Sequence, residues 1–408
     1  MATEWQKVKL GEISNKIQTG SFGSQMKEEW DKKRLDEMGT ISRGRSKHRP
    51  RNDPELFGGD YPFIQTADVK NANLYITNYS QTYNEKGLAQ SKLWQPGTLC
   101  ITIAANIADT GILGIPACFP DSVMGFVPFD DVSDVKFVKY LFNILQKECQ
   151  SISKGTAQDN LSWEKLSQIK FPCPDIKIQR KIVSILSAYD DLIENNNKQI
   201  KLLEEAAQKL YKEWFVKLNF PGHENVKIVD GLPEGWHIGN VGEIGNFKRG
   251  KVITKAQTVK GNIPVIAGGI EPAYYHNVAN TLCPVITVSA SGNAGFVKMY
   301  YCEVWASDCS YLDSNSTDNL FFVYTVLKSK QEYLYSLQKG ACQKHVNATE
   351  INNLEILIPT TDLIIKFNEL SKTYFENIRV LQAQNKDLIS SRDKLLPKLM
   401  NQEIEVTA

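Results

Sequence analysis

The segment IQRKIVSILSAYDDLIENNNKQIKLLEEAAQKLYKEW, residues 178–214, decides the architecture of this protein. Mostly apolar residues recur in it with alternating steps of three and four, the spacing of a coiled-coil seam about five heptads long. The seam consists of Ile182, Leu186, Tyr189, Ile193, Asn196, Ile200, Leu203, Ala207, Leu210 and Trp214. A helix with such a seam needs an apolar partner, so we expect a second helix of the same kind in the chain.

The C-terminal part of the chain contains a suitable partner helix. The same rhythm returns at Ile364, Phe367, Tyr374, Ile378, Leu381, Asn385, Leu388, Leu395 and Leu399. Ser371 and Arg392 interrupt this second seam, so we expect it to be weaker than the first. Antiparallel pairing over the full lengths places Asn196 opposite Asn385, where a buried amide pair fixes the register because any slip leaves both amides without partners. The alternative is that each Asn faces solvent at the edge of the seam.

The regions before the two helices are related copies of one module. Both open on the pattern Trp-x4-Leu/Val-Gly-Glu-Ile, at residues 5–13 and 236–244, an offset of 231. Nearer the helices, Ile101–Thr102 and Ile286–Thr287 share a smaller offset of 185. The first copy is therefore expected to carry about 46 extra residues, mostly within residues 13–62.

Short stretches rich in β-branched and aromatic residues indicate strands in both copies. They are YPFIQTADV (61–69), LCITIAA (99–105), ILGIPACF (112–119), NIPVIAGG (262–269), PVITVSAS (284–291) and AGFVKMYY (294–301). The sequence therefore predicts an α+β protein with similar domains at residues 1–175 and 220–361 and helical regions at 176–219 and 362–408. The helical regions are expected to form an antiparallel coiled coil in a pseudo-twofold arrangement.

The composition agrees with two globular cores. The chain has 408 residues, of which 42% are apolar, and single domains mostly stay below about 250 residues. A formal net charge of +1 excludes a uniformly basic chromatin-type protein. Without a long apolar run or a signal-type start, we expect a cytoplasmic protein with no membrane partner. The eight cysteines form no CxxC pair and are expected to be reduced core thiols.

A strongly basic segment at residues 32–51 is the first candidate DNA-binding surface. The segment contains eight Lys and Arg but only two acidic residues, Asp36 and Glu37, and its cationic residues alternate with small ones. This pattern is typical of a flexible loop that binds phosphates or base edges, although a solvated, disordered insertion is the alternative. We expect no counterpart in the second copy. The predicted DNA contacts are Arg43, Arg45, Lys47, Arg49 and Arg51.

The duplicated turns KGTAQDNL (154–161) and KGACQKHV (339–346) are the second candidate surface. Gly permits close backbone approach, Lys binds a phosphate, and Gln can bridge adenine N6 and N7. A purely structural turn is the alternative. The predicted contacts are Lys154, Gln158, Lys339, Gln343 and Lys344, with Lys248, Arg249, Lys251 and Tyr274 as further candidates in the second copy.

Catalytic patterns are weak in this chain. Asp121, Asp134 and Lys136 have the spacing of a metal-dependent nuclease, in which carboxylates hold Mg²⁺. The same run equally predicts a helix capped near Asp131 or Ser133. The chain contains no glycine-rich cofactor loop after a strand and no NPPY or DPPY tetrapeptide of adenine methyltransferases. A stand-alone nuclease and a helical scaffold that does not bind DNA are the alternatives to a non-catalytic DNA reader.

Two similar domains, each followed by a long helix, resemble the specificity (S) subunit of type I restriction-modification systems. The resemblance covers the whole chain, and its most specific carriers are the linker at 178–222, the junction GLPEGWHIGNVGEI and the terminal RDKLLPKLMNQEIEV. It implies two target recognition domains, each reading one half of a split DNA sequence, and helices that dock two modification subunits. The resemblance also implies that partner chains, and not this chain, carry out adenine methylation and DNA cleavage.

The same resemblance implies that no cofactor binds this chain. S-adenosylmethionine would bind the modification subunits, and ATP and Mg²⁺ would bind restriction subunits where these join the complex. Residue-level transfer from the family is reasonable only at the turns with Lys154 and Gln158 and with Lys339 and Gln343.

Overall fold

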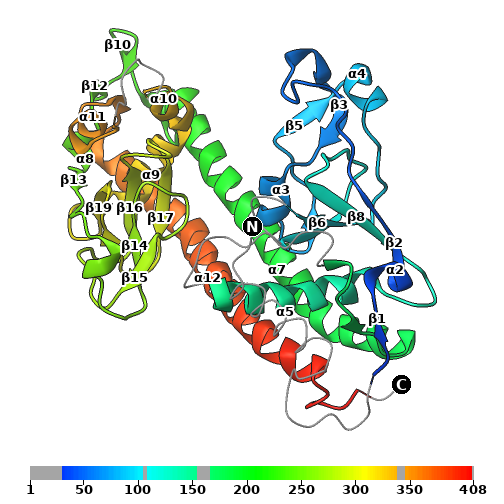
Figure 1. Cartoon of the computed structure of the whole chain (residues 1–408). Coiled ribbons are helices and arrows are strands. Elements are labelled where there is room, and N and C mark those ends of the chain that lie inside the picture. Colours follow the sequence, from blue (N-terminus) through cyan, green and yellow to red (C-terminus); the bar gives the residue numbers. More distant parts are fainter. Residues whose placement is uncertain (1–29, 104–107, 154–165, 338–344, 407–408) are drawn as a thin grey trace. The chain divides into compact units, whose positions relative to one another are not determined.

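The computed structural model describes residues 30–103, 108–153, 166–337 and 345–406 (Figure 1). The chain divides into two compact units. The first unit comprises Met1–Asn195 and Asn385–Ala408, and the second comprises Asn196–Gln384. Because the long helices α7 (Ile176–Tyr211) and α12 (Thr361–Met400) cross these limits, each unit contains part of both.

The first unit is built on a five-stranded sheet in the order β2-β8-β6-β7-β4. Neighbours are antiparallel except for the parallel pair β4 and β7. The strands are β2 (Gly39–Arg43), β8 (Val123–Pro128), β6 (Leu99–Thr102), β7 (Thr110–Leu113) and β4 (Tyr75–Ile76). Two further antiparallel pairs are β3 (Phe57–Phe63) with β5 (Gln81–Tyr83), and β1 (Lys32–Lys33) with β9 (Phe171–Pro172).

Longer helices cover one face of this sheet, and the short helix α3 (Thr66–Asn71) together with loops covers the other. Alternation along β6 places Leu99 and Ile101 in a core with α5, α7 and the end of α12, while Cys100 enters a second core with Trp94 and Phe119. The helices are α2 (Leu35–Met38), η1 (Pro54–Leu56), α3 (Thr66–Asn71), α4 (Glu85–Ala89) and α5 (Val135–Ser153).

One predicted strand is partly wrong. The stretch 61–69 is extended only to Phe63, and α3 begins at Thr66. The reason is local, since the carboxylate of Asp68 accepts the N–H of Gln65 at 2.8 Å and closes a capping box that starts the helix.

The second unit repeats this architecture with a four-stranded sheet in the order β13-β19-β16-β17. Its strands are β13 (Lys248–Arg249), β19 (Cys309–Asp313), β16 (Val285–Ser289) and β17 (Val297–Tyr300). Smaller sheets are formed by β15 (Tyr274–His276), β14 (Ile263–Ile266) and β18 (Trp305–Ala306), by β12 (His237–Asn240) with β20 (Glu355–Ile358), and by β10 (Ile228–Val229) with β11 (Leu232–Pro233).

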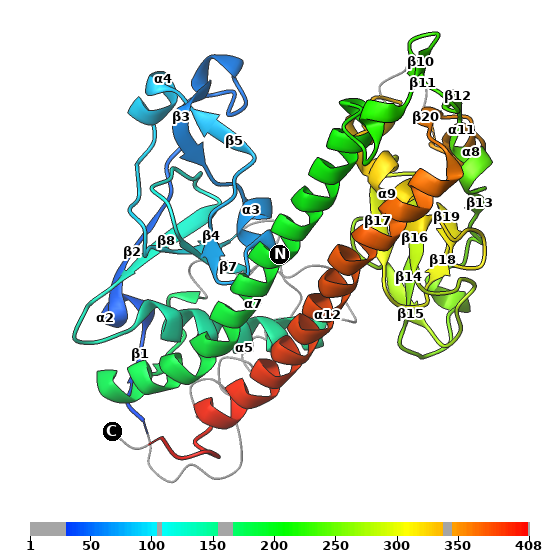
Figure 2. The ribbon, with the colours of Figure 1, turned by 180° about the vertical axis from the view of Figure 1, so that it is seen from behind.

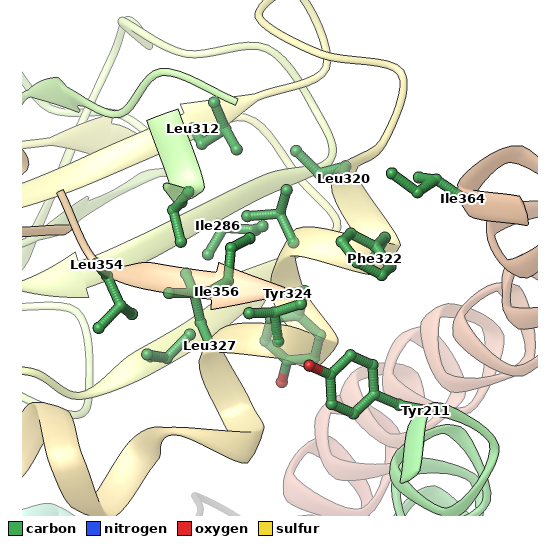
Figure 3. Close-up of a cluster of buried hydrophobic side chains, with 14 of the residues drawn as sticks. Tyr211, Ile286, Leu312, Leu320, Phe322, Tyr324, Leu327, Leu354, Ile356 and Ile364 are labelled. Atoms are coloured by element: carbon green, nitrogen blue, oxygen red, sulfur yellow. The ribbon is translucent and has the colours of Figure 1, made fainter. Parts of the chain in front are cut away.

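Helix α9 (Leu320–Ser329) lies against β16 and β17 on the face that α12 also covers (Figure 2). In the resulting core, Ile286 and Leu312 of the sheet meet Phe322 of α9, Tyr211 of α7 and Ile364 of α12 (Figure 3). The remaining helices of the unit are η2 (Lys212–Val216), η3 (His223–Asn225), α8 (Val241–Ile244), η4 (Lys255–Gln257), α9 (Leu320–Ser329), α10 (Gln331–Ser336) and α11 (Ala348–Asn352).

The duplication is present, but the first copy opens at a different place from the one predicted. In the second unit, β12 pairs with β20 and leads into α8, and in the first unit β1 pairs with β9 and leads into α2. Both helices start with the same capping box, in which Glu37 accepts the N–H of Arg34 at 2.6 Å and Glu243 accepts the N–H of Asn240 at 2.8 Å. The counterpart of Trp236 is therefore Trp30, at an offset of 206.

With Trp30 as the counterpart of Trp236, the first copy carries 21 extra residues before Ile101 and not about 46, and their place also changes. The offset is still 202 at Pro62 and Pro264 and falls to 185 only at Ile101 and Ile286. The insertion consequently lies mainly after Pro62, in the segment that holds α3, β4 and α4, and not within residues 13–62. The predicted opening at residues 5–13 lies outside the described residues.

The long helices contact each other inside each unit. In the first unit, the buried carboxylate of Asp190 pairs with Arg392, a residue that was expected to weaken the second seam. In the second unit, the ring of Phe367 lies 6.4 Å from Tyr211 and 6.0 Å from Trp214, centroid to centroid. Ser371, the other interruption, is fully buried. Arg392 therefore contacts the first helix through a buried ion pair at a position where an interruption of the seam was expected. The weaker second seam stays a prediction.

The two seam asparagines, Asn196 and Asn385, are both buried. Their mutual pairing stays a prediction. None of the helices in the described part of the chain has the length and hydrophobicity needed to span a membrane.

Candidate nucleic-acid interface

The basic segment of the first unit presents its cations on one face. Residues 43–49 alternate, with the odd-numbered residues exposed, while Gly44 and Ser46 are buried. The cationic side chains of this stretch are therefore all accessible to solvent. These exposed side chains are Arg43, Arg45, Lys47, Arg49 and, after the following turn, Arg51.

The same segment is held to the domain at several points, which contradicts the prediction of a flexible or disordered loop. The N–H of Gly44 donates to the carbonyl of Val123 at 2.8 Å, and that of Arg45 donates to Phe119 at 3.0 Å. The hydroxyl of Ser91 donates to the carbonyl of Arg45 at 2.7 Å. A Cβ atom at Gly44 would lie 2.3 Å from the backbone oxygen of Pro120, so only glycine fits this close approach.

The second unit holds an equivalent segment, Arg249-Gly250-Lys251, at the same offset of 206. The N–H of Gly250 donates to Cys309 at 2.8 Å and that of Lys251 donates to Ala306 at 2.9 Å, while the indole N–H of Trp305 donates to the carbonyl of Lys251 at 2.7 Å. Lys248, Arg249 and Lys251 are all exposed. The expectation that the basic segment has no counterpart is therefore wrong for Arg43–Arg45. It holds at Lys47 and Arg51, which fall on Ile253 and Gln257 at the same offset.

Sequence reasoning missed this equivalence, although the signal is present. The pattern Trp-x4-Leu/Val-x-Glu-Met/Ile-Gly-x-Ile/Phe-x-Arg-Gly-Arg/Lys occurs at residues 30–45 and again at 236–251. The stronger-looking match at residues 5–13 concealed it, because that match contains the full Leu-Gly-Glu-Ile tetrapeptide.

The carboxylate of Asp121 contacts the basic segment of the first unit. Asp121 Oδ2 lies 2.7 Å from the guanidinium of Arg51 and 4.0 Å from that of Arg49. The guanidinium of Arg49 also donates to the carbonyls of Ser46 and His48, each at 2.8 Å. These contacts fix two of the five cations in the free protein.

The arrangement of Asp121, Asp134 and Lys136 does not support the nuclease alternative. Asp134 Oδ1 accepts the N–H groups of Lys136 at 2.8 Å and Phe137 at 3.2 Å, so it is the N-cap of α5, one residue beyond the predicted cap at Ser133. Lys136 lies over the ring of Tyr75. Among the described residues, no group of three or more His, Cys, Asp or Glu side chains could hold a metal ion.

The other predicted contacts have mixed outcomes. The hydroxyl of Tyr274 donates to the carbonyl of Ile253 and so helps to hold the chain just after the basic segment. Its predicted contact with DNA remains a prediction. Lys154, Gln158, Lys339, Gln343 and Lys344 lie outside the described residues.

The cysteines only partly follow the expectation of core thiols. Cys100, Cys118, Cys173 and Cys309 are buried, and burial raises the pKa of the Cys309 thiol to about 12. Cys283 and Cys302 are exposed, so the expectation is wrong for these two.

The two units are related α+β domains, and each has exposed cations at an Arg-Gly-Arg or Arg-Gly-Lys segment. The model of the family described as type I restriction modification DNA specificity domain matches residues 27–205 and 233–367. The chain belongs to this family. The two matches begin 206 residues apart, which agrees with the offset between Trp30 and Trp236.

Similar proteins carry corresponding names. The type I restriction enzyme MjaIX specificity subunit of Methanocaldococcus jannaschii is 26% identical over 93% of this chain and 94% of its own length. The HindI specificity subunit of Haemophilus influenzae is 22% identical over 84% of this chain and 94% of its length. The crystal structure of a type I restriction-modification S subunit from M. genitalium covers 94% of this chain and 99% of its own with a TM-score of 0.52 and 17% identity, which shows a shared fold.

Proposed function

We propose that this chain is the DNA specificity subunit of a type I restriction-modification complex and that each unit reads one half of a bipartite target. One observation carries the proposal: equivalent Arg-Gly-Arg and Arg-Gly-Lys segments are each held by two backbone hydrogen bonds, from the glycine and from the cation after it, in two copies of one fold. Two copies of a cationic surface suit two half-sites of one DNA duplex.

The chemistry of the segments fits this role. Guanidinium groups bind phosphate and the O6 and N7 atoms of guanine, while an ammonium group binds phosphate as a point charge. Because the glycine backbone lies against the sheet, the flanking cations of each segment start from fixed positions. We expect base contacts to supply about 1–3 kcal/mol each, and phosphate contacts to add affinity without sequence preference.

The long helices supply the spacing in this proposal. We infer that α7 and α12 form an antiparallel coiled coil along their full lengths. The contact of Asp190 with Arg392 and that of Tyr211 with Phe367 fit a single antiparallel register. The 36 and 40 residues of the helices span about 54 and 60 Å, compared with about 34 Å per turn of duplex.

The chemistry of the complex is assigned to partner chains. We propose that two modification subunits dock on this chain and carry S-adenosylmethionine for adenine methylation. Restriction subunits, where they join, would bring ATP and Mg²⁺ for DNA cleavage. The names of the relatives, all specificity subunits of type I enzymes, support this division of roles. In the same proposal the chain acts in the cytoplasm.

An exchange of the second reading surface tests the proposal. The methylated motif on host DNA should be bipartite, and replacement of residues 250–340 by those of a relative should change one half of it and leave the other half and the spacing unchanged. A matched exchange of residues 44–153 should change the opposite half. A single contiguous motif, or a change of both halves by either exchange, would contradict half-site reading.

A further inference from the structure

The carboxylate of Asp121 is an unusual neighbour for a DNA-binding segment. Its Oδ2 atom pairs with Arg51 at 2.7 Å and reaches Arg49 at 4.0 Å. Its Oδ1 atom is buried and has no hydrogen-bond partner among the described residues. The carboxylate is thus partly desolvated, and its ion pair with the guanidinium of Arg51 is the main interaction that offsets this desolvation.

A carboxylate and a phosphate compete for the same face of a guanidinium group. The planar fork of arginine can donate two parallel hydrogen bonds to either anion. A DNA phosphate that approaches Arg51 must therefore displace Asp121 or share the cation with it. In both cases the negative charge of Asp121 opposes the approach of the phosphate.

The second unit provides a natural comparison. The acceptors for Arg45 and Lys251 are the carbonyls of Phe119 and Ala306, and the residue two positions further on is an aspartate in each copy, Asp121 or Asp308. The carboxylate of Asp308 accepts the hydroxyl of Ser291. In the part of the chain that the structure describes, no Lys or Arg forms an ion pair with Asp308.

We propose that Asp121 is a specificity-determining residue, which competes with DNA phosphate for Arg51 and Arg49 and so weakens sequence-independent binding by the first unit. The inference rests on the proposed function. Phosphate contacts supply essentially all of non-specific affinity. A non-specific complex can shift until any available cation meets a phosphate, whereas base contacts fix the register on the target. The carboxylate of Asp121 therefore weakens non-specific DNA binding more than it weakens binding to the target.

The test compares the full chain with its Asp121→Asn variant on a 30-base-pair duplex of random sequence and on a duplex with the mapped target. Asp121→Asn should raise affinity for the random duplex about fivefold and steepen the salt dependence by about one counterion. Affinity for the target should rise by less than about twofold, so the specificity ratio falls. Asp308→Asn is the matched control and should leave random-duplex binding within about twofold of wild type, because it releases no cation.

A second substitution separates competition from a merely structural role of Asp121. Arg51→Gln in the Asp121→Asn background should return the random-duplex affinity to about the wild-type value, because the released cation is absent. Asp121→Ser offers the same comparison if the asparagine variant unfolds at a lower temperature than wild type.

Two results would overturn the inference. Equal loss of affinity for both duplexes in the Asp121 variants would mean that the ion pair only holds the segment in place. Unchanged affinity for the random duplex would mean that Asp121 does not compete with phosphate. If the wild-type chain shows no salt-dependent binding to any duplex, the proposed function itself fails together with this inference.

Discussion

The ion pair between Asp190 and Arg392 makes a strong prediction about the stability of the first unit. The side chains are only 4% and 17% exposed, and the hydroxyl of Tyr140 donates to the second oxygen of Asp190 at 2.5 Å. Asp190→Ala would leave a largely buried guanidinium and a buried hydroxyl without this partner. Breaking a buried pair costs about 3–5 kcal/mol. Arg392 keeps Asp393 at 2.9 Å, so we expect a loss near the lower limit, about 3 kcal/mol.

Urea denaturation of the full chain measures this loss as a fall of about 1–2 M in the midpoint of the transition of the first unit. The exposed pair of Lys201 and Glu205 in the second unit is the control, and Glu205→Ala should lower the stability of that unit by about 0.5 kcal/mol or less. The double change Asp190→Leu with Arg392→Met should recover most of the stability, because it removes both charges. A loss for Asp190→Ala no larger than that for Glu205→Ala would refute the reasoning, since it would mean that solvent screens the pair.

Two further predictions follow from single residues. Burial lowers the pKa of Lys139 from 10.5 to about 8, although the nearby charge of Asp190 acts in the opposite direction. Between pH 8 and 10.5 the unfolded chain therefore binds more protons than the folded chain. The free energy of unfolding should consequently rise as the pH increases from about 8 to 10.5. Urea titrations at several pH values should show this rise in wild type and lose it in Lys139→Met, whereas the same rise in the variant would exclude Lys139 as its source. Gly44→Ala and Gly250→Ala each place a Cβ 2.3 Å from a backbone oxygen, so the segment must shift, and we expect about tenfold weaker duplex binding and a smaller salt dependence. Gly269→Ala, whose nearest neighbour would lie at 3.4 Å, should bind like wild type, and equal weakening by Gly269→Ala would contradict the argument.

The amino-acid sequence alone identified the two long helices and the core strands. The seam from Ile182 to Trp214 is a local periodicity, and α7 covers it up to Tyr211 before the chain continues as the π-helical turn η2. The stretch 284–291 likewise contains β16, because β-branched residues fit a half-buried pleated surface. Such features depend on neighbours within a few residues, and so they can be read before the tertiary structure is known.

Tertiary contacts decided the features that depend on distant partners. The Trp-x4-Leu pattern occurs at both residue 5 and residue 30, and the pairing of β1 with β9, about 140 residues away, marks Trp30 as the counterpart of Trp236. Arg392 reads as a defect in its seam, but Asp190 makes it a buried ion pair. Asp121 reads as a metal ligand, but it binds arginines 70 residues away in sequence. A short segment determines its own preference for helix or strand. The role of a charged side chain, in contrast, depends on the opposite charge that folding places beside it.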